Sequence, residues 1–508
     1  MRASIRLRFN SGLPIMSRKS VSLSVLTSAV VLAAVFAVFE KLPLRARAVN
    51  ASASAPVLAT PSPDVKSAPA VRVPARTLPP DTQVHTVGKG ESVPGIVHHY
   101  LPLTTFLTGS ELETAIRAAN PDIKGLWPKP GSEVLIPAYK EHWSEKPVLI
   151  SKNFEVRAVY LTGTMAGSAK GLEIIRKWRE AGGNSVVFDI KDSDGSVSVP
   201  TGLPLAPEQK SYPIRNLPKF TAYLHSLGLH GIARIAIFRD DALVTKHPEL
   251  AVQSRTSGGA WRENGKLVWT DSSNPKVWEY NIGLAKFAAA NGADEIQFDY
   301  VRFPAEGDQK DAKFVFEAQH PNWKRGDAIT HFLQQAQAEI KPMGVLFSLD
   351  VFGVMAWQRS IDLSHTGQDI PQMAKYCDVM SPMIYPSHFY GMDGYTSPGD
   401  APEHFIGESM ARFQKVTAES GVVLRPWLQA FGWRTKSYSP EYIRIQVAVS
   451  RSKGGNGFLF WNANNDYSKP YSAMPEMRQD KAKYFRGDEV KSYTETAAAA
   501  IGNAKAAN

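Results

Sequence analysis

Three aspartates of this 508-residue chain lie toward the ends of short apolar runs. Asp189 follows Val-Val-Phe, Asp299 follows Ile-Gln-Phe, and Asp350 follows Leu-Phe-Ser-Leu. Successive side chains of a β-strand point to opposite faces, so each aspartate takes the face opposite to the large apolar side chain before it. A carboxylate among apolar side chains is costly unless it is paired or solvated. The three aspartates therefore predict a polar, water-accessible pocket.

Two of these aspartates, Asp299 and Asp350, belong to consecutive strand-like runs. Two carboxyl groups on neighbouring strands can cleave a glycosidic bond, one as nucleophile or base and the other as proton donor. The sequence has no serine nucleophile elbow, no His-Glu-x-x-His helix and no phosphate-binding loop. We therefore predict a catalytic pair that needs no metal ion and no organic cofactor.

The alternative for each aspartate is a structural role as the buried partner of a cation such as Lys191, Arg302 or Arg425. It is strongest for Asp189, because Lys191 follows two residues later. Other polar residues near the strand ends could orient a sugar, and aromatic rings could stack on it, although such rings are also common in cores. The supporting candidates are Asp189, Lys191, Asp192, Arg302, Tyr385, Gln429 and Trp461, with Trp427 and Trp433 as further aromatic candidates.

Apolar, strand-like runs alternate with amphipathic helical patterns throughout residues 154–484. There are eight such runs: Val156–Gly163, Ser185–Lys191, His230–Phe238, Glu295–Val301, Leu346–Gly353, Asp378–Tyr385, Val422–Ala430 and Gly457–Asn462. This alternation predicts an α/β fold, a (β/α)8 TIM barrel, whose functional residues gather at the carboxyl ends of the strands. A doubly wound open sheet is the competing architecture, but no Gly-x-Gly-x-x-Gly turn follows the first run.

Ahead of the barrel, residues 84–139 predict a small β-α-α-β unit. A short strand ends in Gly90-Glu91-Ser92-Val93, two helical patterns follow, and Pro130–Pro137 supplies a turn and a closing strand. With Asn120-Pro121 after the second helix, these residues resemble the LysM family, with Glu91 and Ser92 where the family carries Asp and Thr. The resemblance implies binding of glycans that contain N-acetylglucosamine. The groove would be lined by Gly90, Glu91, Ser92, Val93, Asn120, Pro121, Asp122 and Ile123.

The barrel region also resembles a known family. Residues 156–162, residues 187–195 and above all the string Asp-Tyr-Val-Arg-Phe-Pro at 299–304 are similar to a bacterial family of TIM-barrel glycoside hydrolases, over about residues 154–470. The wider clan, which includes the α-amylase-like barrels, implies Asp299 as nucleophile and Asp350 as acid/base. That clan usually carries Arg two residues before the nucleophile and Glu as the acid, whereas this chain has Gln297 and Asp350. Arg302 is the candidate for a compensating cation.

The charge of the chain, +10 overall, is concentrated at its start. Residues 1–48 hold eight Lys/Arg against Glu40, and the remainder is nearly balanced, which disfavours nucleic acid as a partner. The apolar stretch at residues 21–39 follows Arg18 and Lys19, so residues 1–48 predict a signal peptide or a membrane anchor. Residues 49–83 form an Ala/Pro/Ser-rich linker, and residues 485–508 form a polar, Ala-rich tail.

Together these features predict an exported glycoside hydrolase of the cell envelope. It would reside in the periplasm, in the cell wall or outside the cell, either free or anchored in the cytoplasmic membrane by residues 21–39. Its substrate would be a polysaccharide, with peptidoglycan-associated glycan as one candidate, and the LysM-like module would bind cell-wall glycan. The alternative is a non-catalytic glycan-binding scaffold or receptor. A polysaccharide deacetylase or lyase is weaker, because His388 and His404 show no metal-ligand spacing.

Overall fold

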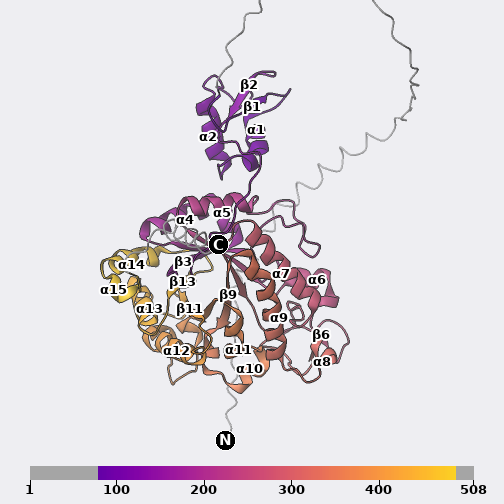
Figure 1. Cartoon of the computed structure of the whole chain (residues 1–508), viewed down its shortest axis with the longest axis vertical. Coiled ribbons are helices and arrows are strands. Elements are labelled where there is room, and N and C mark those ends of the chain that lie inside the picture. Colours follow the sequence, from indigo (N-terminus) through magenta and orange to yellow (C-terminus); the bar gives the residue numbers. More distant parts are fainter. Residues whose placement is uncertain (1–77, 488–508) are drawn as a thin grey trace, which may run out of the picture. The chain divides into compact units, whose positions relative to one another are not determined.

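The computed structural model describes residues 78–487 (Figure 1). The predicted signal or anchor at residues 1–48, nearly all of the linker and residues 488–508 of the tail lie outside the described residues. Across residues 78–487, no helix is both long enough and apolar enough to cross a membrane.

The first described unit is small and has its own core. Strand β1 (Gln83–Thr86) pairs antiparallel with β2 (Glu133–Ile136), and α1 (Val93–Tyr100) and α2 (Gly109–Ala119) lie between them in the chain. The order is the strand-helix-helix-strand order expected from the sequence. Its core is formed by Val87, Val93, Ile96, Val97, Tyr100, Leu112, Ile116, Val134 and Ile136.

A closed barrel of eight parallel strands follows, with α-helices around it (Figure 1). The strands are β3 (Val156–Leu161), β4 (Ser185–Lys191), β5 (His230–Ala236), β7 (Glu295–Asp299), β9 (Leu346–Phe352), β10 (Val379–Ile384), a split strand β11 (Val423–Leu424) and β12 (Trp427–Gln429), and β13 (Gly457–Trp461). The sheet closes because β13 pairs with β3 and β9 pairs with β10. The eight runs predicted from the sequence are these strands, and the TIM-barrel prediction is confirmed.

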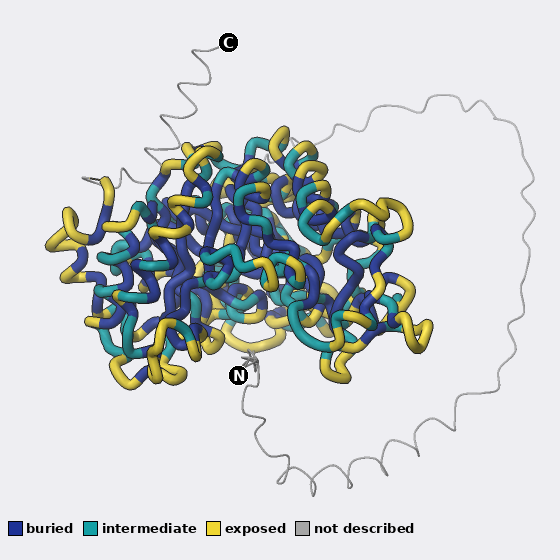
Figure 2. Tube along the Cα trace, turned by 90° about the horizontal axis from the view of Figure 1, so that it is seen from below, coloured by how far each residue is buried: buried dark blue, intermediate teal, exposed yellow. Residues whose placement is uncertain are grey.

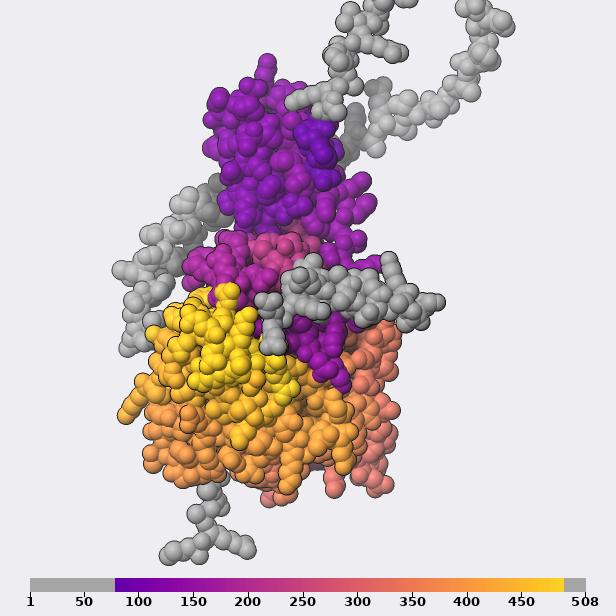
Figure 3. Space-filling model, turned by 60° about the vertical axis from the view of Figure 1, so that its left-hand side comes forward, coloured from indigo at the N-terminus to yellow at the C-terminus, as the bar shows by residue number. Residues whose placement is uncertain are grey.

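Helices cover the outside of the barrel, and short elements decorate its loops. The main helices are α4 (Ala169–Ala181), α5 (Leu217–Ser226), α7 (Pro275–Ala290), α9 (Arg325–Ile340), α12 (Pro402–Val416), α13 (Pro440–Ser452) and α14 (Ser468–Gln479). The short elements are α3 (Gly163–Ala166), α6 (Asp241–Lys246), α8 (Phe316–Gln319), α10 (Ser360–Thr366), α11 (Ile370–Met373), α15 (Lys481–Tyr484) and an antiparallel ribbon of β6 (Gln253–Ser254) with β8 (Ala312–Lys313). The orange-to-yellow surface of Figure 3 contains the C-terminal helices, among which α12 packs on α13 and α13 on α14.

Local sequence explains several helix starts. Asn274 and Ser439 each precede a proline at the first helical position, and their side chains accept hydrogen bonds from Lys276 N (3.0 Å) and Tyr442 N (3.2 Å). Such caps satisfy backbone donors that the helix itself leaves free, and the proline has no N–H to lose.

Side chains of the strands alternate between two cores, as their period-two pattern predicts. Phe188 packs on Phe220 of α5 and Phe298 packs on Phe332 of α9, so the large aromatics lie under the helices. The inward-facing residues form a second core inside the barrel, made chiefly of Val156, Ala158, Tyr160, Val187, Ile232, Leu346, Trp427 and Leu459. Figure 2 shows that the buried segments lie in the interior and the exposed ones on the periphery.

A buried polar layer lies within the barrel below the aspartates. Arg425 donates to both carboxylate oxygens of Glu295 at 2.9 Å, and His230 lies 3.1 Å from the same carboxylate. The Arg425 guanidinium and this histidine together hold the pKa of Glu295 down to about 2 against the opposing effect of burial. Arg425 is therefore the partner of Glu295 and of none of the three aspartates.

Candidate active site

The side chain of Asp299, at the end of β7, is held from two directions. Its Oδ2 accepts hydrogen bonds from Arg234 Nη2 at 2.7 Å and Nε at 3.2 Å. Its Oδ1 accepts from the backbone N–H of Tyr300 at 2.6 Å. Tyr300 has a φ of 55°, a left-handed conformation that is rare for a residue with a side chain and that turns the chain at the strand end. Asp299 is thus paired with a cation, oriented and buried.

Arg234, on β5, is the centre of the site. Its Nη1 lies 2.5 Å from Asp189 Oδ1, its Nη2 contacts Asp299, and its Nε lies 4.0 Å from Asp350 Oδ2. One guanidinium thus joins carboxylates from three other strands, β4, β7 and β9. Arg234 Nε lies 3.2 Å from Asp299 Oδ2 and 4.0 Å from Asp350 Oδ2, so these two oxygens are at most about 7 Å apart. This upper limit admits the carboxyl separation of retaining glycosidases and the shorter separations found in inverting ones.

Sequence analysis missed Arg234, although a signal for it existed. Arg234 lies in the strand His-Gly-Ile-Ala-Arg-Ile-Ala, where it shares the inward face with Ile232, and a charge on the buried face of an apolar strand marks a functional or structural ion pair. Arg234 pairs in register with Gln297, two residues before Asp299. The resemblance to the α-amylase-like barrels implied a cation at the position of Gln297, and in this structure the neighbouring strand places Arg234 beside it.

Asp350, on β9, is buried at 1% exposure and has fewer hydrogen-bond partners than Asp189 and Asp299. Trp427 Nε1 donates to its Oδ1 at 2.7 Å, while its buried Oδ2 has no hydrogen-bond partner among residues 78–487. Burial and the nearby charge of Asp299 raise the pKa of Asp350 well above its usual range, and Arg234 only partly offsets them. A raised pKa favours the protonated form of Asp350, which is the form that a general acid needs.

Asp189, on β4, completes the cluster. Its Oδ2 accepts a hydrogen bond from the Tyr160 hydroxyl at 2.5 Å, and its Oδ1 faces Arg234. Burial raises the pKa of Asp189 to about 7, against the lowering effect of the Arg234 charge. The structure thus brings the three aspartates together, but it buries them at 1–6% exposure instead of placing them in the water-accessible pocket that the sequence predicted.

Two of the supporting candidates have other roles. A β-bulge between Asp189 and Lys191 redirects Lys191, whose ammonium lies fully buried against Asp240 Oδ2 at 2.8 Å, so it is not the partner of Asp189. The guanidinium of Arg302 lies over the rings of Phe352 (4.4 Å) and Trp269 (4.6 Å) and donates to Phe303 O, so Arg234 and not Arg302 is the cation bound to Asp299.

Asp192 lies in the loop after β4: its side chain is 41% exposed and its Oδ1 is 3.8 Å from Arg234 Nη1.

The other candidates, Tyr385, Gln429, Trp461 and Trp427, lie on or directly after β10, β12 and β13. The ring of Tyr385 lies 5.7 Å from that of Trp461, which is partly exposed. Gln429 is buried and its amide is fully engaged by Phe431 O, Thr435 Oγ1 and the N–H of Ser387, which makes it a supporting residue of the two loops. Trp427 is 2% exposed and acts as a donor to Asp350 rather than as an open stacking surface.

The residues predicted for the LysM-like groove serve the small unit in several ways. The side-chain amide of Asn120 donates to Ile116 O and Leu135 O and accepts from the N–H of Leu135. Backbone groups therefore occupy this side chain. Glu91 accepts from Gly88 N and contacts His85, both of which hold the pKa of Glu91 below its usual range, and Ser92 caps α1. Gly90 has a φ of 78°, Pro121 and Asp122 are exposed, and Ile123 packs at the edge of the core.

The two loops of this predicted groove lie together. The N–H of Val93 donates to Leu126 O at 2.8 Å, which joins the loop before α1 to the loop before β2. Leu126 (56%) and Trp127 (67%) are exposed beside this junction, and sequence analysis did not single them out. An exposed tryptophan next to the two loops is the aromatic surface that sugar rings favour.

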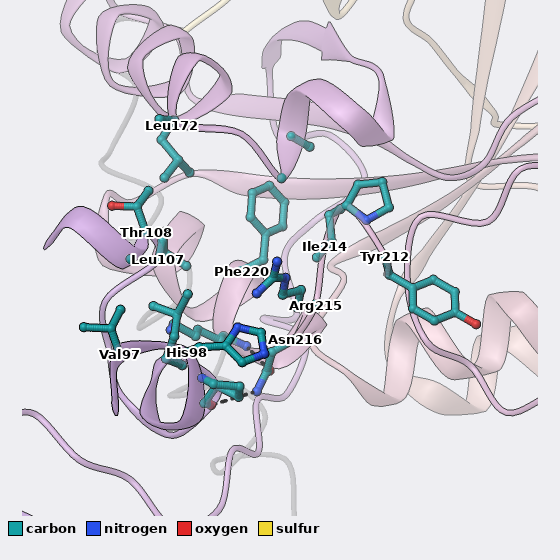
Figure 4. A pocket seen from close by; sticks show the side chains of 18 of the residues that line it. Val97, His98, Leu107, Thr108, Leu172, Tyr212, Ile214, Arg215, Asn216 and Phe220 are labelled. Carbon is teal, nitrogen blue, oxygen red and sulfur yellow. Dashed lines mark hydrogen bonds between the residues drawn. The ribbon is translucent and has the colours of Figure 1, made fainter. Parts of the chain in front are cut away.

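A pocket elsewhere in the chain is shown in Figure 4. It is lined by residues that include Val97, Leu107, Leu172, Ile214 and Phe220. None of the three aspartates lines it, so it is separate from the carboxylate cluster.

Comparison with known proteins relates the barrel to glycoside hydrolases. Residues 158–467 match the family described as "Putative glycosyl hydrolase domain". A hypothetical protein from Ruminiclostridium thermocellum is 35% identical over 38% of this chain and 97% of its own, with a TM-score of 0.34. The glycoside hydrolase domain of PgaB (BpsB) from Bordetella bronchiseptica is 13% identical over 65% of this chain and 99% of its own, with a TM-score of 0.49. Alpha-L-fucosidase isoenzyme 2 from Paenibacillus thiaminolyticus is 14% identical over 65% of this chain and 50% of its own, with a TM-score of 0.47.

No curated protein matches the chain. The family match spans more than half of the sequence and contains all three aspartates and Arg234. The chain therefore belongs to the family described as "Putative glycosyl hydrolase domain".

Proposed function

We propose that the barrel cleaves a polysaccharide of the cell envelope with Asp299 as nucleophile and Asp350 as acid/base. The observation that carries this proposal is the different surroundings of two neighbouring carboxyl groups: Asp299 forms an ion pair with Arg234 at 2.7 Å, whereas burial and the nearby charge of Asp299 raise the pKa of Asp350. Two carboxyl groups whose surroundings drive their protonation apart are typical of glycoside hydrolysis.

In the proposed reaction, Asp350 gives its proton to the glycosidic oxygen as the bond to the anomeric carbon breaks. The Asp299 carboxylate attacks that carbon and forms a glycosyl ester. Asp350, now ionised, then takes a proton from water, whose oxygen attacks the anomeric carbon and releases Asp299. Arg234 keeps Asp299 oriented through both steps, and Asp189 with Tyr160 holds Arg234 in place.

The proposal extends to the rest of the chain. The small unit would bind N-acetylglucosamine-containing glycan, and the apolar stretch at residues 21–39 would direct export and either be cleaved or remain as an anchor. What supports this is the order of the elements in residues 83–136, the joined loops beside Trp127, and the basic residues that precede the apolar stretch.

The test is release of reducing ends from purified peptidoglycan and from a panel of α- and β-glucans. Asp299→Asn and Asp350→Asn keep the side-chain shape and should each lower turnover by at least about 1,000-fold, or about 4 kcal/mol in the barrier. The control is Asp194→Asn, at an exposed aspartate in the loop after β4, which should leave turnover unchanged. Near-normal hydrolysis by Asp299→Asn would refute the mechanism. Binding of a glycan with no hydrolysis by the wild type would favour the receptor alternative.

A further inference from the structure

Aromatic rings form a continuous path from the carboxylate cluster to the exposed loops after β10 and β12. The path begins at Tyr385, beside the cluster: burial and the charges of Asp350 and Asp299 raise the pKa of its hydroxyl. The ring centroids of Tyr385 and Phe431 are 5.6 Å apart. Phe431 and His388 are 6.0 Å apart, and His388 and Trp433 are 5.2 Å apart. The path thus leads from the buried site to Trp433, which is 44% exposed.

A cation lies at the outer end of this path. The guanidinium carbon of Arg434 is 4.4 Å from the centroid of Trp433 and 5.5 Å from that of Tyr390, which is 64% exposed. Arg434 is itself exposed and forms no ion pair with any residue between 78 and 487. A guanidinium that lies against aromatic faces keeps its N–H donors free at its edge, where they match the two oxygens of a carboxylate.

The loop that carries Trp433 and Arg434 is held in place before any ligand arrives. Gln429 donates to Phe431 O at 2.9 Å and to Thr435 Oγ1 at 2.8 Å, and Thr435 Oγ1 donates to Trp433 O at 3.0 Å. Gly399 lies so close to Arg434 O that an added Cβ would be 2.3 Å from it.

The backbone of Arg434 adds to this picture. Its φ of 49° is in the left-handed region, which is unfavourable for a non-glycine residue and persists only where the surroundings impose it. A fixed cation–aromatic pair loses little conformational entropy when it binds a ligand.

We propose that Trp433, Tyr390 and Arg434 form an outer subsite for a sugar ring that carries a carboxylate. The inference rests on the proposed function, because it assigns a substrate class to the same site. A glycan that is bound for cleavage at Asp299 and Asp350 extends over Tyr385, Phe431 and Trp461 and places an acidic sugar against Arg434. Two sources share this chemistry: a uronic acid, and a sugar with a lactyl ether such as N-acetylmuramic acid.

The experiment measures binding of matched oligosaccharides to the full-length protein carrying Asp299→Asn, which prevents turnover. The ligands are peptidoglycan glycan strands without peptides, oligouronates of equal length, and the carboxyl-reduced form of each. Arg434→Gln should weaken binding of one carboxylate ligand about tenfold, equivalent to about 1.4 kcal/mol, and leave its reduced form unchanged. The ligand that shows this difference identifies the source of the carboxylate.

Two further variants separate this inference from its alternatives. Trp433→Ala should weaken binding of the charged and the reduced ligand alike, and Lys436→Gln, which removes an exposed cation from the same loop, should change neither. The small unit is the same in all variants, so its own glycan binding cancels. Equal loss for charged and reduced ligands in Arg434→Gln, or no loss, would overturn the subsite. Absence of any glycan binding by the parent protein would instead refute the proposed function.

Discussion

At the scale of single residues, the site depends on how one guanidinium is shared among several carboxyl groups. Arg234 contacts Asp189 and Asp299 directly and lies 4.0 Å from Asp350. Burial and the nearby charge of Asp299 raise the pKa of Asp350, and the charge of Arg234 offsets them only in part. Because both residues are aspartates, the proposed division into nucleophile and acid depends on their surroundings: the ion pair of Asp299 with Arg234 and the burial of Asp350.

The raised pKa of Asp350 predicts a pH dependence of stability. The pKa of Asp350 is raised in the folded protein above its value of 3.8 in an unfolded chain. The folded state therefore binds more protons than the unfolded state above about pH 4, and this contribution to the free energy of unfolding is lost as pH rises. The asparagine in Asp350→Asn cannot ionise. The melting temperature of this variant minus that of the wild type should therefore increase from pH 5 to pH 9. A difference that is constant over this range would show that Asp350 is ionised in the fold.

Removing the shared cation should destabilise the barrel. Arg234→Ala leaves Asp299 buried without its ion pair, and breaking a buried pair in this way costs about 3–5 kcal/mol in the free energy of unfolding. The loss, measured by urea denaturation, should be larger at pH 8 than at pH 5, because Asp189 has a pKa of about 7 and becomes neutral at the lower pH. Arg262→Ala, at an exposed arginine, is the control and should change stability by less than about 0.5 kcal/mol.

At the scale of elements, the barrel closes where β13 meets β3, and Gly457 makes this contact possible. Gly457 pairs with Val156 and has a φ of 79°. A Cβ at this position would lie 2.1 Å from Val156 O, a distance at which backbone must move. The first strand and the last strand, which are far apart in the sequence, can therefore pair only because this residue is a glycine.

Gly457→Ala should be strongly destabilising. The left-handed φ alone costs about 1–2 kcal/mol for a residue with a Cβ, and displacement of the β3 backbone adds to it. Gly344→Ala is the matched control, because Gly344 has a φ of 74° but no atom within 4 Å of an added Cβ. Chemical denaturation should show a larger loss for Gly457→Ala than for Gly344→Ala. Equal losses would mean that β13 and β3 adjust freely at the closure.

At the scale of the whole molecule, the proposal links a small glycan-binding unit to a hydrolytic barrel. The small unit has its own core of nine buried residues, and its two joined loops lie beside Trp127. A fragment of residues 78–139 should therefore sediment with insoluble chitin or peptidoglycan. Trp127→Ala should reduce the bound fraction, whereas Asp81→Ala, at an exposed residue before β1, should not. Sedimentation no better than that of an unrelated protein would refute glycan binding by this unit.

Export is the second prediction at this scale. An alkaline phosphatase reporter fused after residue 150 should be active, because the enzyme folds only outside the cytoplasm and the basic residues before residues 21–39 favour a cytoplasmic N-terminus. Replacing Val31 and Ala34 by Arg within the apolar stretch should abolish reporter activity. Activity that survives this change would mean that residues 21–39 do not direct export.

The sequence alone determined the barrel and the direction of its aspartates. Each strand is recognised by its own run of apolar residues, and the face that Asp189, Asp299 and Asp350 take follows from a period of two within that run. The same local pattern placed Phe188 and Phe298 under the helices, where the structure has them. Local periodicity is a property of a few consecutive residues, so it needs no knowledge of the partner strands.

Only the tertiary structure decided how these residues are paired. The register between β5 and β7 places Arg234 opposite Gln297, and the register between neighbouring strands depends on packing across the whole barrel. The bulge after Asp189 turned Lys191 toward Asp240, although the sequence spacing favoured a contact with Asp189. The protonation of Asp350 depends on burial and on its distance to Arg234, because electrostatic energies depend on positions in space rather than on separation along the chain.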